Sequence, residues 1–116
     1  MKLHLLICTT IFLVCGCSTA TYTQSTPKAT KAEIDSAWAS NYRCLAYNSN
    51  QLDDNRSSVD VIAKAVVSSC SQQTSYFYNT LTRGSGPFDS AKVYDAVESK
   101  SYNTALQVLL KNRATK

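Results

Sequence analysis

The sequence predicts an all-α fold, a small bundle of three to four helices that contains a disulfide-linked helical hairpin. Apolar residues recur at helical spacing through the segments that follow residue 30. Glycine and proline are scarce, at three and two of 116 residues, which disfavours a fold with many turns. Hydrophobic residues make up 44% of the chain and charged residues 17%, so a folded core is expected.

The first helix is expected to begin after Thr30. Thr30 and Glu33 have the spacing of a capping box, in which each side chain accepts a hydrogen bond from the other residue's backbone N–H. The helix is expected to fade between Asn48 and Leu52. Its inward stripe consists of Ile34, Trp38, Asn41 and Leu45.

A second helix is expected after the turn Asp53–Arg56, with Ser57 or Ser58 as its cap. Its inward stripe extends for about 20 residues, which is longer than a strand, so one long helix is predicted. The segment 84–87 should end it. The stripe consists of Val59, Ile62, Ala63, Val66, Cys70, Phe77 and Leu81.

A third helix is expected to be capped by Asp89 or Ser90 and to run to about Ser99, with Val93, Tyr94 and Val97 facing inward. The polar run 99–101 favours a break before a fourth helix, and one bent helix is the alternative. The inward residues of the fourth helix are Tyr102, Ala105, Leu106, Leu109 and Leu110.

The first residues have the three parts of a secretory signal peptide: a positive start, an apolar run over 3–14, and small residues. That run is about half the roughly 20 residues needed to span a bilayer. The next residues, Val14-Cys15-Gly16-Cys17, resemble the lipobox of bacterial lipoproteins. The resemblance implies that residues 1–16 are a signal peptide and that Cys17 becomes the acylated amino terminus. An ordinary signal cut near Ala20, which would discard Cys17, is the alternative.

The resemblance also implies where the protein resides. Acyl chains contribute about 0.8 kcal/mol per buried methylene, so two or three of them, such as palmitate, hold a protein firmly on a bilayer. Ser18 follows the lipidated cysteine, and in enterobacterial lipoproteins a serine there favours the outer membrane, facing the periplasm. Residues 17–29 are rich in serine and threonine and are interpreted as a flexible tether. Residues 30–116 form the predicted helical domain.

Two of the five cysteines remain for the folded domain. Cys8 and Cys15 leave with the signal peptide, and Cys17 is the lipid site. Cys44 and Cys70 are then an even pair in an oxidising compartment, and a structural disulfide is expected between them. Two free buried thiols or a redox-active pair are the alternatives, although the sequence lacks a Cys-x-x-Cys motif.

The residues needed for catalysis are scarce in the predicted mature chain. The only histidine is His4, within the signal peptide, so we expect no catalytic residues, no metal site and no cofactor. Asp53 and Asp54 are interpreted as turn residues and not as a catalytic or calcium-binding pair. The formal charge of +4, without interleaved basic and aromatic residues, does not favour a nucleic acid partner.

Seven tyrosines, against three phenylalanines and one tryptophan, are the feature that points to a binding role. Tyr47, Tyr76 and Tyr78 are the candidate partner-binding residues, and the alternative is that they border a small core. The sequence therefore favours a non-enzymatic adaptor or accessory subunit that binds an envelope protein. Its predicted architecture is similar to that of the pilotins, small helical lipoproteins that escort outer-membrane secretion channels.

A small inhibitor or exclusion lipoprotein, of the type that phages and plasmids carry, is the alternative function. It would act on an enzyme or an incoming agent through a protruding loop, for which the segment Asn48–Arg56 is the candidate.

The lipobox resemblance predicts the mass of the native product. Protein purified from its own envelope should begin at Cys17 and carry two or three acyl chains, which intact mass spectrometry would detect. A mass that matches an unmodified polypeptide, or one that begins at another residue, would contradict the assignment.

Overall fold

The computed structural model describes residues 26–115, with the side chains of residues 87 and 88 excepted. The predicted signal peptide, Cys17 and most of the predicted tether lie outside these residues. The described part contains four helices and no strand: α1 (Lys31–Leu52), α2 (Val59–Ser69), α3 (Ser71–Thr82) and α4 (Pro87–Ala114). No helix among residues 26–115 is both long enough and apolar enough to cross a membrane.

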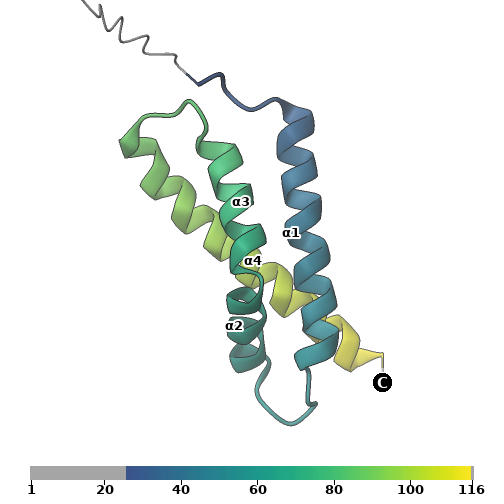
Figure 1. The fold of residues 1–116 in the computed structure, drawn as a ribbon. Coiled ribbons are helices and arrows are strands. Elements are labelled where there is room, and N and C mark those ends of the chain that lie inside the picture. The colour runs from purple at the N-terminus through teal and green to yellow at the C-terminus, as the bar shows by residue number, and fades with distance from the viewer. Residues whose placement is uncertain (1–25, 116) are drawn as a thin grey trace, which may run out of the picture.

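The predicted fold class is confirmed. In Figure 1, α2 and α3 follow one another in the direction opposite to α1, and α4 crosses the other helices obliquely. Each pair of helices is in contact. Cys44 of α1 and Cys70 form a disulfide with a Cα–Cα distance of 5.9 Å, so the helical hairpin is linked as expected.

The beginning of α1 is tied to the end of α3. The predicted capping box is present: the Glu33 backbone N–H donates to Thr30 Oγ1 at 3.3 Å, and the Thr30 N–H donates to Glu33 Oε2 at 2.7 Å. Arg83 Nη2 also donates to Glu33 Oε2, at 2.6 Å. The hydrogen bond from Arg83, followed by those from Thr30, lowers the pKa of Glu33 to about 2.

The described chain enters the bundle beside the α3–α4 loop. Gly84 has φ +74°, and a Cβ at this position would lie 2.7 Å from the carbonyl oxygen of Thr26, so a side chain would meet both backbone strain and a clash. Figure 1 places this loop at the opposite end of the bundle from the α1–α2 turn. The first described residue, Thr26, therefore lies at the α3–α4 end of the domain.

Two aspartates organise the α1–α2 turn, in agreement with their interpretation as turn residues. Asp54 Oδ1 accepts hydrogen bonds from the backbone N–H groups of Arg56 and Ser57. The side chain of Asp53 is only 2% exposed, and it accepts from Arg113 Nη2 of α4 at 2.6 Å. The α1–α2 turn is thus fastened to the C-terminal end of α4.

The segment Asn48–Arg56, where a protruding loop is expected, is only partly a loop, and its exposed non-helical residues are Asp54, Asn55 and Arg56. Residues up to Leu52 continue α1, and the ion pair between Asp53 and Arg113 holds the turn against α4. The position of the cap predicted for α2 is confirmed. Ser58 is the N-cap residue, but its side chain makes no capping hydrogen bond.

The prediction of one long second helix is wrong, because α2 and α3 meet at a bend. Cys70 has φ −100° and ψ 16°, outside regular helix geometry, and its N–H is shared between the carbonyl oxygens of Val66 and Val67. Serines surround the bend, and serine has low helix propensity because its hydroxyl competes for backbone groups. Ser69 shows this competition, since its Oγ donates to the carbonyl oxygen of Ala65.

The break favoured at residues 99–101 is absent, and α4 is continuous from Pro87 to Ala114, as in the one-helix alternative. Ser101 is fully buried and uses its hydroxyl in a hydrogen bond with α1, so its polarity is satisfied inside the bundle. The helix also begins earlier than predicted. Gly86 is its N-cap and Pro87 is its first residue, a position where proline costs no hydrogen bond.

The core consists of two apolar clusters separated by a polar layer. One cluster lies between α1, α2 and the C-terminal half of α4, and includes Leu45, Val66 and Leu109. The other lies between α1, α3 and the N-terminal half of α4, and is centred on Phe77 and Val97. Each cluster thus uses a different half of α1 and of α4.

Asn41 forms the polar layer between the two clusters. It is fully buried, and its Nδ2 donates to Ser101 Oγ of α4 at 2.9 Å. Thr74 Oγ1 of α3 donates to Asn41 Oδ1 at 3.1 Å. One amide therefore joins three helices, and a shift of any helix along its axis would leave a buried polar group unpaired.

Two residues predicted to face inward are substantially exposed. Tyr94 is 50% exposed and Leu110 is 54% exposed. Each lies next to a position that does face the core, at Val93 and Leu109. Adjacent residues on a helix point about 100° apart, so when one of them faces the core its neighbour points partly toward solvent.

Asn41→Leu should destabilise the protein by about 1–3 kcal/mol, because the hydroxyls of Thr74 and Ser101 lose their shared partner while side-chain volume changes little. Urea unfolding followed by circular dichroism measures this loss. The control Asn103→Leu, at an exposed position of α4, should change the free energy of unfolding by less than about 0.5 kcal/mol. Equal effects of the two substitutions would contradict the role of the polar layer.

Candidate functional site

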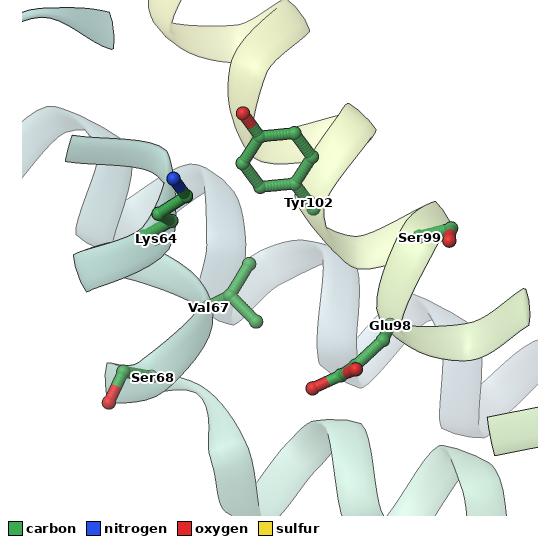
Figure 2. Close-up of a pocket in the computed structure, with 6 residues that line it drawn as sticks. All are labelled: Lys64, Val67, Ser68, Glu98, Ser99 and Tyr102. Carbon is green, nitrogen blue, oxygen red and sulfur yellow. The ribbon is translucent and has the colours of Figure 1, made fainter. Parts of the chain in front are cut away.

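A groove runs between α4 on one side and α2 and α3 on the other. Its larger hollow has a volume of about 510 Å³, and Val67 and Glu98 point into it from facing helices (Figure 2). A second hollow of about 150 Å³ shares Val67, Ser68 and Glu98 and continues beside α3. We call the two together the tyrosine groove. Its remaining lining residues are Lys64, Ser71, Thr74, Ser75, Tyr78, Tyr94, Val97, Ser99 and Tyr102.

Short side chains along α2 and α3 account for the tyrosine groove. Ser68, Ser71 and Ser75 line it around the bend at Cys70. Their small volume leaves space that a leucine or phenylalanine would fill. Val67 and Val97 supply apolar lining, and hydroxyl groups surround them. The result is a concave, amphipathic surface of the kind that ligand sites use.

A hydrogen-bonded group of three residues closes one end of the groove. The Tyr102 hydroxyl of α4 donates to Asp60 Oδ1 of α2, and Lys64 Nζ donates to Asp60 Oδ2 at 2.9 Å. The bond from Tyr102 and then that from Lys64 lower the pKa of Asp60. The same contacts raise the pKa values of Tyr102 and Lys64, so at neutral pH the group holds an ionised Asp60, a neutral phenol and an ammonium.

Two tyrosines border the other end. The rings of Tyr78 and Tyr94 meet edge to face, with centroids 5.6 Å apart. The Tyr94 hydroxyl donates to Glu98 Oε1 at 3.3 Å. The negative charge of Glu98, followed by this hydrogen bond, raises the pKa of Tyr94. Glu98 thus presents a carboxylate at the middle of the groove.

The structure does not bring the three predicted partner-binding tyrosines together. Tyr78 lines the tyrosine groove and is half-buried. Tyr76 is 55% exposed, and because residues two apart point about 200° from each other on a helix, it faces away from Tyr78. Tyr47 is 65% exposed on α1 and does not line the groove.

Sequence reasoning missed two residues of this site. Tyr94 and Tyr102 were both expected to face the core. Tyr94 is instead half exposed, whereas Tyr102 does pack against the core but is only half-buried and also lines the groove wall. The sequence did contain a signal for this site. Tyr94, Glu98 and Tyr102 follow one another at four-residue spacing, which places them on one face of a helix.

The groove's chemistry suits binding. It offers hydroxyl donors and acceptors, one carboxylate and one ammonium around an apolar strip, which match a peptide that carries both backbone amides and side chains. Within the described residues 26–115, no group of three His, Cys, Asp or Glu side chains is placed to hold a metal ion.

Comparisons with protein families, with characterised proteins and with solved structures found no match for this chain.

Proposed function

We propose that the protein is a lipid-anchored bacterial envelope lipoprotein, a non-enzymatic adaptor that binds a segment of a protein partner in the tyrosine groove. The anchor is the acylated Cys17, and the location is the outer membrane, facing the periplasm. The observation that carries the binding role is the amphipathic groove bordered by Tyr78, Tyr94 and Tyr102.

The position of the chain's entry supports the anchored arrangement. Residues 17–25 separate Cys17 from the first described residue, and nine residues reach at most about 30 Å when extended. Thr26 then lies against Gly84 at the α3–α4 end of the bundle. The α3–α4 end would face the membrane, and the tyrosine groove would open along the side of the bundle, where a partner can reach it.

The residue types along the groove favour a protein partner over a small polar ligand. Tyrosine combines a large contact area with few rotatable bonds, and it is frequent among the residues that dominate binding energy at protein interfaces. The serine hydroxyls opposite the tyrosines can pair with the backbone groups of a bound segment. Glu98 would favour a segment that carries a basic residue near the middle of the groove.

Inhibition or exclusion is a second function that the same surface would suit. It would bind an enzyme or an incoming agent in the tyrosine groove in place of a resident envelope protein. The identity of the captured partner distinguishes the two functions.

Photo-crosslinking in the native envelope tests the site. Benzoylphenylalanine in place of Ser75, inside the groove, should capture a discrete protein, whereas the same residue in place of exposed Ser36 of α1 should not. Tyr94→Ala should then lower the crosslinking yield by about tenfold, since buried interface tyrosines contribute more than about 1 kcal/mol.

Tyr76→Ala is the matched control, because Tyr76 is similarly exposed but lies outside the groove. An equal loss from Tyr76→Ala, or capture of the same protein from position 36, would contradict the groove as the binding surface.

A further inference from the structure

A second cleft lies between α1, α3 and the N-terminal half of α4, and its lining is almost wholly apolar. It has a volume of about 380 Å³. Five of its lining residues are large and apolar: Ile34, Phe77, Leu81, Val93 and Val97. The tyrosine groove shares only Val97 with this cleft.

A single cation is fixed beside the apolar lining. Lys100 Nζ lies 4.0 Å from the centroid of the Trp38 ring and 5.8 Å from that of Phe77. Lys100 lines the cleft and is exposed. Among residues 26–115, no carboxylate forms an ion pair with it, so its charge is held in place by the two rings and is open to an anion.

The limited exposure of the apolar lining favours a thin ligand. Phe77 and Val97 are nearly completely buried, and the other large apolar residues that line it are half-buried. Among the side chains that the structure describes, none of the exposed large apolar ones lines the cleft. A helix about 10 Å across would need exposed large apolar side chains to pack against, whereas a single hydrocarbon chain can be held by a cleft of about 380 Å³ whose large apolar residues are half-buried or buried.

We propose that this cleft binds a single-chain anionic lipid, such as a long-chain fatty acid. The hydrocarbon chain lies along Phe77, Leu81 and Val93, and the carboxylate meets Lys100 above Trp38. An acid is favoured over a neutral lipid because the ammonium of Lys100, which has no acidic partner, lies at the rim of an apolar cleft and can pair with a carboxylate. Binding of a fatty acid in this cleft does not depend on the adaptor function or on the tyrosine groove.

Trp38 is the chain's single tryptophan, so its fluorescence reports on this cleft. The full-length lipidated protein in phosphatidylcholine vesicles should show saturable quenching when dibromostearic acid is added. Dibromostearyl alcohol, with the same chain and no charge, should quench much less. Lys100→Glu should weaken the binding of the acid by about tenfold, since it replaces an attraction with a repulsion.

Two further variants separate binding from folding. Ala96→Phe adds bulk at the exposed mouth of the cleft and should abolish saturable quenching, while Lys92→Glu, on the same helix outside the cleft, should bind the acid as the native protein does. Circular dichroism should be unchanged in all three variants.

The proposal is overturned if the acid gives no saturable quenching, if the alcohol binds equally well, or if Lys100→Glu and Lys92→Glu behave alike. Absence of saturable quenching would mean that the cleft does not take a free fatty acid and has another occupant or none, the other occupants being a partner helix or the protein's own acyl chain.

Discussion

The disulfide between Cys44 and Cys70 joins α1 to the bend between α2 and α3, and the bundle is arranged around this joint. Cys70 is fully buried, and Asn48 Nδ2 lies 3.4 Å and 3.5 Å from the two sulfur atoms. With the bend fixed against α1, α2 and α3 pack on different halves of α4. The tyrosine groove lies along this bend, so the covalent link and the candidate site belong to one structural feature.

The polar layer at Asn41 complements the disulfide. The disulfide limits the freedom of the unfolded chain, while the amide of Asn41 selects one register among α1, α3 and α4 in the folded state. Small domains often need such links, since an apolar core of this size provides little net stability. The two ends of the bundle are fastened separately, by Arg83 with Glu33 and by Arg113 with Asp53.

Hydrophobic periodicity and capping signals were sufficient to predict an all-α bundle and the start of α1 after Thr30, and the count of cysteines left after the signal peptide predicted the disulfide. They failed at Cys70 because serine-rich sequence is compatible with either a bend or a helix, and the disulfide decides between them through a tertiary contact. They failed at Ser101 because a buried hydroxyl breaks a helix only when it lacks a partner, and Asn41 lies 60 residues away. Tyr94 and Leu110 were misplaced because adjacent positions on a helix differ in exposure by packing that local sequence does not encode.

The described domain thus combines a covalent link, a polar layer and two clefts, one between α2, α3 and α4 and the other between α1, α3 and α4. Its dependence on the joint is tested most directly by the free energy of unfolding of the Cys44→Ala/Cys70→Ala protein, measured in urea beside the oxidised native protein. For a sequence separation of 26 residues, the chain-entropy relation predicts a loss of about 3.5 kcal/mol. A loss below about 1 kcal/mol would show that packing alone holds the bend, and would contradict the account.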